Sequence, residues 1–469
     1  MINLSFILQS LGDICGSSSI IYKPELLISY TQDWRKRYHG TAIAVVFPYT
    51  VEQIQQLVKF CGEHQIALIP QGGNTSTCGA ATPLANYTQP QLIINLQKLN
   101  KIIEIDQQNY SITVEAGCTL QQIHNSLSAY GLHFPLTLAS QDSCQIGGNL
   151  ATNAGGTQVI KYGMIRDLTL GLQAVMPDGS LINQLYKLRK NNTYFDLKQL
   201  LIGSEGTLGI ITHACLKIYP QPPQLLTFLC ACDTISQALE LLAKLKYYYT
   251  NNVSSFEIIK FETWQIYQHY FPLDPEIAKM PWSIIAEIEI NNDFIIDNLI
   301  DIFGQCKIDL TSTIIAINEL ERKKLWQLRE QIPLAEKQYG YAAKHDIALP
   351  LSNLEDFLAE NMPKLIHLIP NGYFSIFGHL GDGNLHYNFG LANSSLVDLA
   401  ELEHTISPIV YTDVIKYSGT ISAEHGIGQS KIFWLKNFYT SAEYQLLSQI
   451  KSLIDPQNLF NPSKVILKS

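Results

Sequence analysis

The 469-residue sequence has no long apolar run and no excess of positive charge. No stretch reaches the roughly 18 apolar residues that a membrane-spanning helix needs, so we do not expect a transmembrane segment. Lys and Arg number 32 against 41 Asp and Glu, which gives a net charge of −9. Because no basic run interleaved with aromatic residues is present, a nucleic-acid partner is not expected, and a small-molecule partner is.

The nine cysteines are too dispersed for a disulfide framework or an iron–sulfur cluster. No Cys-x-x-Cys motif occurs, and one residue separates Cys230 from Cys232. We therefore predict reduced thiols. The N-terminus lacks a basic region followed by a small-residue cleavage site, so we expect a cytoplasmic chain. A peripheral position at the inner membrane stays open, because a groove for a lipid electron carrier leaves no hydropathy signal.

The chain also lacks the two familiar phosphate-binding motifs. Neither a Walker A sequence nor a Gly-x-Gly-x-x-Gly that opens a helix is present. Apolar periodicity predicts helices and strands that do not alternate in the βαβ rhythm of a Rossmann fold. In the first half, residues 48–52 are predicted to open a helix, capped by Thr50, that runs through residues 53–61. A second helix is predicted at 120–130, and strands are predicted at 66–69, 92–96, 101–106 and 111–115.

A proline cluster at residues 219–223 indicates a boundary between two mixed units. The last part of the chain, from about Asn437, is predicted to be helical. The pattern as a whole predicts an α+β fold. Beyond the proline cluster, a helix is expected at residues 236–248 and strands at 226–231, 254–261 and 282–290.

Three glycine-rich segments in the first half suit the binding of a phosphorylated cofactor. Glycine lets backbone N–H groups turn toward an anion, so such a loop binds phosphate oxygens without cationic side chains. Taken singly, each segment is equally compatible with an ordinary tight turn. The segments are residues 70–76, 145–156 and 203–209.

Two histidines flank an Asp-Gly turn in the second half. Asp382 and Gly383 lie between alternating polar and apolar runs, a strong signal for a tight hairpin that would place His379 opposite His386. Directly opposed side chains have Cβ atoms about 5 Å apart. Both imidazoles would then reach one ion, and this spacing suits zinc.

Taken in order, these motifs resemble the FAD-binding oxidases of the vanillyl-alcohol oxidase fold type, in the branch of D-lactate, D-2-hydroxyglutarate and glycolate dehydrogenases. The resemblance covers nearly the whole chain, from the motif at residues 30–34 to Asn461 and Pro462. Between them, it is carried by residues 70–76, 147–156, 201–209, 325–330, 379–386 and 423–426.

The resemblance implies an FAD-binding domain of two subdomains (PCMH type) at residues 1–220, which begins with a helical lead-in. It also implies an α+β cap domain for the substrate at 221–420 and a helical segment at 421–469 that returns to the flavin. It implies non-covalent FAD, since no histidine occupies the first glycine loop. By that likeness, loop 72–76 holds the pyrophosphate and Glu205 lies toward the adenosine. The implied FAD-binding residues are Pro70, Gly72, Gly73, Asn74, Thr75, Ser76, Gly147, Gly148, Asn153, Gly156, Glu205, Gly209, Ile210 and Asn461.

The branch implies oxidation of a D-2-hydroxy acid, with D-lactate or D-2-hydroxyglutarate as the expected substrate. We assign His379, His386 and Glu424 as ligands of a divalent cation, for which Zn²⁺ is the best fit and iron or manganese are poorer ones. His425 is the expected base for the hydroxyl proton. Asn384 and Asn388 are expected to orient the substrate or the ligands.

A carboxylate substrate needs a cationic anchor, and the planar guanidinium of Arg329 can grip a carboxylate at two points. Lys344 is the expected second anchor. The sequence departs from the hydroxyglutarate branch at Pro333, where a threonine is typical, so recognition of a second carboxylate stays open. The alternative for Arg329 is a helix-surface ion pair with Glu330 or Glu336.

Electrons are expected to pass to a quinone, an electron-transfer flavoprotein or a cytochrome, with oxygen less favoured. A zinc hydrolase is the competing class, since the same His379, His386 and Glu424 could activate water. The FAD subunit of a multi-subunit glycolate oxidase complex is another alternative. The oligomeric state is open, with a homodimer among the options.

Overall fold

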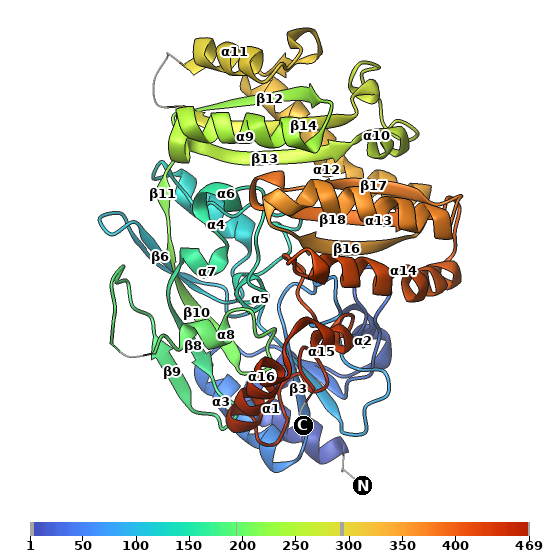
Figure 1. Cartoon of the computed structure of the whole chain (residues 1–469). Helices are drawn as coiled ribbons and strands as arrows, with labels where there is room; N and C mark the ends of the chain where they lie inside the picture. Colours follow the sequence, from blue (N-terminus) through green and yellow to red (C-terminus); the bar gives the residue numbers. More distant parts are fainter. Residues whose placement is uncertain (1–3, 194, 291–294, 468–469) are drawn as a thin grey trace. The chain divides into compact units, whose positions relative to one another are not determined.

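The computed structural model describes residues 4–193, 195–290 and 295–467. These residues form two compact units (Figure 1). The first comprises the chain up to Gly155, Met164–Gln221 and Glu424 onward, and the second comprises Gly156–Gly163 and Pro222–Ala423. The domains 1–220, 221–420 and 421–469 stay predictions about cofactor and substrate roles. No sequence signal singled out the short stretch Gly156–Gly163.

The first unit contains a four-stranded sheet in the order β1-β2-β4-β3, in which β2, β4 and β3 are parallel. Alternate residues along β4 face opposite sides, as the twofold period of a strand requires. Leu92 and Ile94 pack with α1 and α3, and Ile93 packs with α2 on the other side. The bounds are β1 (Ile20–Ile21), β2 (Ala44–Val46), β3 (Ala67–Gln71), β4 (Gln91–Asn95), α1 (Leu4–Cys15), α2 (Pro24–Thr31) and α3 (Val51–Glu63).

The first unit also contains a five-stranded antiparallel sheet in the order β5-β6-β10-β8-β9. A two-stranded pair, β7 and β11, and short helices complete the unit. The strands are β5 (Ile102–Asp106), β6 (Ser111–Glu115), β7 (Leu132–His133), β8 (Thr169–Val175), β9 (Leu181–Gln184), β10 (Ile210–Lys217) and β11 (Tyr219–Pro220). The helices are α4 (Leu120–Ser128), α5 (Ile146–Ala151), α7 (Ile165–Leu168), α8 (Lys198–Leu201), α15 (Leu435–Phe438) and α16 (Ser441–Ile454).

The second unit is built on a seven-stranded sheet in the order β15-β12-β14-β13-β17-β18-β16, with antiparallel neighbours throughout. Its strands are β12 (Gln224–Cys232), β13 (Val253–Lys260), β14 (Trp282–Ile290), β15 (Ile314–Ile315), β16 (Ala342–Ala348), β17 (Tyr373–Gly378) and β18 (Asn384–Gly390). The helices are α6 (Val159–Tyr162), α9 (Ile235–Tyr249), α10 (Phe261–Tyr267), α11 (Ile295–Gln305), α12 (Glu319–Tyr339), α13 (Leu354–Leu368) and α14 (Leu396–Lys416).

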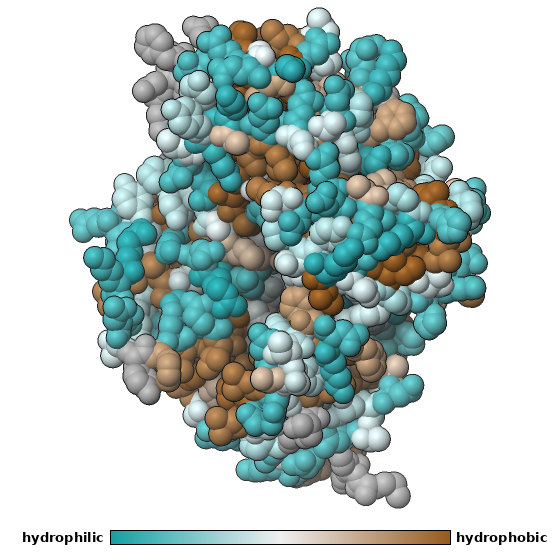
Figure 2. All heavy atoms as spheres, viewed as in Figure 1, coloured by the Kyte–Doolittle hydropathy of each residue, from teal (hydrophilic) through white to brown (hydrophobic). Residues whose placement is uncertain are grey.

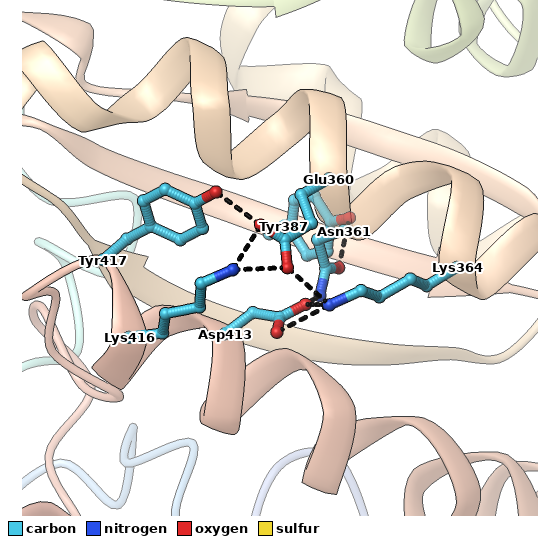
Figure 3. Close-up of polar contacts among 7 residues, drawn as sticks. All are labelled: Glu360, Asn361, Lys364, Tyr387, Asp413, Lys416 and Tyr417. Atoms are coloured by element: carbon cyan, nitrogen blue, oxygen red, sulfur yellow. Dashed lines mark hydrogen bonds and ion pairs between the residues drawn. The ribbon is translucent and has the colours of Figure 1, made fainter.

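Helices α11, α13 and α14 pack on one face of this sheet. On one face Phe228 and Phe256 are buried, and Phe228 meets Phe303 of α11 edge to face at 5.1 Å. A polar cluster fixes α13 and α14 on the same side of the sheet, because Tyr387 of β18 donates to Asn361 of α13 at 2.7 Å (Figure 3). The cluster comprises Glu360, Asn361, Lys364, Tyr387, Asp413, Lys416 and Tyr417.

Helix α12 crosses the opposite face of the sheet. It begins after Asn318, whose side chain accepts the N–H of Glu321 at 3.0 Å, a standard N-cap. Three of its residues at intervals of seven contact three strands of the sheet: Arg322 reaches β14, Arg329 reaches β13 and Glu336 reaches β18. A seven-residue step advances about 10 Å along a helix, which brings each residue back to the same side of α12.

Several predicted elements are confirmed closely. Strands β6 and β14 have the predicted bounds, and the Thr50 side chain caps α3 by accepting the N–H of Gln53 at 3.3 Å. Among the described residues, no helix combines the length and apolar character needed to cross a membrane. Figure 2 shows polar residues interspersed with apolar ones over the visible face.

Candidate functional site

The hairpin that carries the two histidines differs from the prediction. Strands β17 and β18 are joined by five residues, of which Leu380–Asp382 form a 3-10 turn and Gly383 takes a left-handed φ of 85°. His386 therefore pairs with Phe377, and the predicted pairing of His379 with His386 is wrong. The prediction assumed a two-residue turn, which needs positive φ at both central positions, and Asp382 does not adopt it.

The longer turn still brings the two imidazoles together. The ring centroids of His379 and His386 lie 5.6 Å apart with their planes at 77°, and one ring nitrogen of each lies within 4.8 Å of the other. His379 is buried and His386 is half-buried. Two imidazole nitrogens at this separation can bind one divalent cation, because each ligates at about 2 Å.

A buried glutamate that the sequence analysis missed holds His379 in place. Nδ1 of His379 donates to Oε1 of Glu257 at 2.5 Å, and Nε of Arg329 donates to Oε2 of the same carboxylate at 2.8 Å. Burial alone would raise the pKa of Glu257, but the adjacent His379 and Arg329 outweigh it and hold the pKa below its ordinary value. Because Glu257 binds Nδ1, a metal ion held by His379 would be bound through Nε2.

Arg329 is not the helix-surface residue of the alternative interpretation. It is buried, it pairs with Glu257 and not with Glu330 or Glu336, and its guanidinium lies 4.6 Å from the ring centroid of Phe377. Within the described part of the chain, Nε makes the guanidinium's hydrogen bond, and Nη1 and Nη2 make none. Two parallel donors are thus left for a planar anion.

His386 and Asp346 lie opposite each other on β18 and β16. Nδ1 of His386 lies 3.9 Å from Oδ1 of Asp346, which is buried and accepts Nδ2 of Asn384 at 3.0 Å. Asn384 also donates to the carbonyl of Ile347 at 2.8 Å, and its buried Oδ1 has no hydrogen-bond partner among the described residues. A buried amide oxygen without a partner, on a residue that also binds Asp346, suits a site that receives a cation or a hydroxyl group.

Lys344 and Asn388, both predicted to bind substrate, are engaged by another acidic residue that sequence reasoning missed. They lie opposite each other on β16 and β18. Nζ of Lys344 donates to Oε2 of Glu336 at 2.7 Å, and Nδ2 of Asn388 donates to Oε1 at 2.7 Å. Glu336 is 1% exposed. The ammonium of Lys344 therefore faces a carboxylate of the chain itself.

Glu424 and His425, the other two predicted residues of the metal site, open the last stretch of the first unit. The residue before them belongs to the second unit, where the N–H of Ala423 donates to the carbonyl of Asp346 at 3.2 Å. Their roles as ligand and base stay proposals.

The first glycine loop leaves the carboxyl end of β3. Asn95, at the end of the parallel neighbour β4, fixes the loop by donating to the carbonyl of Gly72 at 3.1 Å. Asn74 has φ of 53°, and a Cβ on Gly73 would lie 1.9 Å from the carbonyl oxygen of Ser143, so glycine is required there. Among the described residues, the N–H groups of Gly73, Asn74 and Thr75 donate no hydrogen bond. Such a turn is suited to an anion.

The other two glycine segments of the first unit pack against it. A Cβ on Gly147 would lie 2.7 Å from that of Ala116, whereas Gly148 has no atom within 4 Å of the place its Cβ would take. The ring of Pro70 lies 3.2 Å from the corresponding place at Gly206. Asn153 accepts the N–H of Arg166 at 3.1 Å, and Gly209 and Ile210 lead into β10. Gly156, by contrast, groups with the second unit.

Glu205 ties the third glycine segment to the C-terminal part of the first unit. Its carboxylate accepts the N–H groups of Ile427 at 2.7 Å and Gly428 at 3.0 Å, and its carbonyl accepts Nδ2 of Asn461 at 2.7 Å. Burial raises the pKa of Glu205 to about 7 and lowers that of the neighbouring, fully buried Lys464 to about 7. The predicted residues Pro70, Glu205 and Asn461 are thus brought together within one unit.

The chain matches two protein families and a solved structure. The family described as FAD binding domain matches residues 42–184, and the family described as FAD linked oxidases, C-terminal domain, matches residues 221–465. The structure of p-cresol methylhydroxylase with substrate bound superposes with a TM-score of 0.78 over 99% of this chain and 97% of that one, at 16% identity. The predicted α+β fold with an FAD-binding domain of the vanillyl-alcohol oxidase type is confirmed.

Relatives with named activities match over most of their length. The mitochondrial D-2-hydroxyglutarate dehydrogenase of Danio rerio is 33% identical over 451 residues, which are 95% of this chain and 82% of the relative. The D-2-hydroxyglutarate–pyruvate transhydrogenase of Saccharomyces cerevisiae is 30% identical over 458 residues, which are 94% of this chain and 90% of the relative.

Proposed function

Because this chain belongs to the family of FAD-linked oxidases, we propose that it oxidises a D-2-hydroxy acid to the 2-oxo acid with the help of a divalent metal. D-Lactate and D-2-hydroxyglutarate are the candidate substrates. A quinone, an electron-transfer flavoprotein or a cytochrome would take the electrons. The zinc-hydrolase alternative has no support from the family matches, both of which describe FAD-linked domains.

The glycine loops of the first unit fit FAD. The unengaged N–H groups of Gly73, Asn74 and Thr75 would hold the pyrophosphate, and the open space beside Gly148 leaves room for a planar ring. When bound, FAD supplies the acceptor for the hydride that leaves the α-carbon. Glu205 and Asn461 would shape the loops around it without contributing to the chemistry.

The two histidines of the second unit fit a divalent cation, with Zn²⁺ the expected ion. Nε2 of His379 and a nitrogen of His386 would bind the cation, and Glu424 would be the third ligand. The N–H of the preceding residue, Ala423, donates a hydrogen bond to the carbonyl of Asp346, which supports this role for Glu424. When bound, the cation lowers the pKa of the substrate hydroxyl.

The residues of the chain would divide the reaction between them. The Nη1 and Nη2 groups of Arg329 hold a substrate carboxylate as a bidentate pair. His425 accepts the hydroxyl proton while the α-carbon loses hydride, so the C–O single bond becomes a carbonyl and the product is the 2-oxo acid. One observation carries this proposal: Glu257 connects the metal-ligand candidate His379 and the carboxylate anchor Arg329 through a single buried carboxylate.

Two variants test the roles of Glu424 and His425 separately. Glu424→Ala should lose bound metal and activity together, because it removes a ligand. His425→Asn should keep FAD and metal but slow flavin reduction by roughly 100-fold or more, the contribution of a general base. Normal metal content in the first variant would refute the ligand role, and normal reduction in the second would refute the base role. If the chain is the FAD subunit of a multi-subunit glycolate oxidase complex, the substrate should reduce its flavin, but the isolated chain should show no turnover with artificial acceptors.

A further inference from the structure

Glu336 occupies an unusual position for an acidic residue in a site that would bind an anion. It lies on the same side of α12 as Arg329, two turns further along. Its carboxylate is buried and bridges Lys344 and Asn388 at 2.7 Å each. These two partners lie opposite each other two residues along the strands from the row of His386 and Asp346, and therefore on the same face of the sheet. The two rows are about 7 Å apart, the distance of two residues along a strand.

The charges of this region leave little to bind a second carboxylate. Lys344 is the expected second anchor after Arg329, but its ammonium forms an ion pair with Glu336. The amide of Asn388 is committed to the same carboxylate. A negative group placed there would face Glu336, whose burial leaves its charge poorly screened by solvent.

Between Arg329 and Glu336, α12 carries a proline where a hydrogen-bond donor could have served a second carboxylate. Pro333 lies one turn after Arg329 and less than a turn before Glu336, within α12. Its ring has neither an N–H nor a hydroxyl group. On the neighbouring strand β17, the Ser375 hydroxyl lies opposite Asn388, is fully buried and has no partner among the described residues. That group can serve a neutral substituent but carries no charge to offset an anion.

We propose that Glu336 is a specificity-determining residue that makes the enzyme prefer D-2-hydroxy acids whose side chain is uncharged. The inference rests on the proposed function and adds the substrate class to it. The carboxylate at C1 is held by Arg329, and the side chain extends toward the Lys344–Glu336 pair, where a second carboxylate is disfavoured by like charge.

The test compares kcat/KM for D-lactate, D-2-hydroxybutyrate and D-2-hydroxyglutarate with an artificial electron acceptor. The wild type should favour the two monocarboxylates over D-2-hydroxyglutarate by about tenfold or more. Glu336→Gln keeps a side chain that can still bridge Lys344 and Asn388 but removes the charge. It should shift the ratio toward D-2-hydroxyglutarate by about tenfold, mainly through KM. Glu330→Gln, an exposed position of the same helix, should leave the ratio unchanged.

Each outcome has a distinct meaning. If the wild type favours D-2-hydroxyglutarate, the inference is wrong. This comparison needs no variant, so the inference can be tested even if Glu336→Gln fails to fold. A folded, flavin-containing Glu336→Gln protein with the wild-type ratio also overturns it. If no hydroxy acid of either class reduces the flavin, the proposed function itself fails.

Discussion

At the residue scale, one buried carboxylate organises the candidate site. Glu257 accepts hydrogen bonds from His379 and Arg329 with its two oxygens. A carboxylate on the second nitrogen of a ligating histidine fixes the tautomer and makes the free nitrogen a better ligand. Removal of the negative charge of Glu257 should therefore weaken both metal binding by His379 and binding of the substrate carboxylate by Arg329.

We expect Glu257→Gln to lower metal affinity by roughly 10- to 100-fold and to raise KM for the hydroxy acid. The measurement is the zinc retained after dialysis against a graded chelator, together with steady-state kinetics. Glu287→Gln is a matched control, because Glu287 is buried on the same sheet face and pairs with Arg322 but touches no candidate ligand. Equal loss of metal in both variants would show that the effect is a general one on the sheet.

A second residue-scale prediction concerns Glu205, whose pKa is raised by burial from an ordinary 4.5 to about 7. The folded state therefore favours the protonated form, so the stability contributed by this group is full below pH 4.5 and is lost as the pH rises through 7. A shift of this size corresponds to roughly 3 kcal/mol.

Glu205→Gln should remove the decrease in folding stability that ionisation of Glu205 causes as the pH rises through 7. Chemical denaturation between pH 4.5 and 8 should show wild-type stability falling relative to the variant as the pH rises. Lys464, whose pKa is lowered to about 7, acts in the opposite direction and in a different window, since it loses stability as the pH falls from 10.5 toward 7. Parallel curves for the two proteins below pH 7 would contradict the assignment.

At the element scale, the β17–β18 hairpin shows how far the sequence could be interpreted. The Asp-Gly signal correctly predicted two strands and a turn, and the two imidazoles do meet. The register could not be predicted, because an Asp-Gly pair also fits a longer loop in which only the glycine has positive φ. Glu257, Asp346 and Glu336 were missed for a related reason. Each is a single acidic residue whose partners lie on other elements, and at least one partner of each is more than 35 residues away in the sequence.

We expect Gly383→Ala to destabilise the protein by roughly 1–3 kcal/mol or more and to lower metal binding. Gly383 has φ of 85°, and a Cβ there would lie 2.2 Å from the carbonyl oxygen of Leu349. Gly304→Ala in α11 is the control, since no atom lies within 4 Å of its added Cβ and the helical position tolerates alanine. Thermal unfolding of the two variants and their zinc content provide the comparison. Gly383→Ala behaving like the control would exclude a tight turn at this point.

At the scale of the whole molecule, the sequence predicted more than it did at the site. The three glycine segments and the histidine hairpin identified the family over nearly the full chain, and the family matches confirm it. The grouping of Gly156–Gly163 with the second unit could not be predicted. It depends on Lys161 and Tyr162, which both contact the buried Glu289 of β14, and a strand glutamate gives no sequence signal for so distant a partner.

We predict that FAD stabilises the folded protein. A ligand that binds only the folded state adds about 2.7 kcal/mol at 100 times its dissociation constant. The melting temperature of the flavin-free protein should therefore rise when FAD is added. Riboflavin should raise it much less, because riboflavin lacks the pyrophosphate that the 72–76 loop would hold. Equal shifts for both would indicate that this loop does not bind phosphate.

The most direct measurement is the visible absorbance of the purified, flavin-containing protein under anaerobic conditions, before and after a D-2-hydroxy acid is added. Our prediction is that the flavin bleaches with the D-enantiomer, that the L-enantiomer leaves it oxidised, and that prior chelation of metal slows the bleaching. A flavin that stays oxidised with every D-2-hydroxy acid offered to the metal-loaded protein would contradict it.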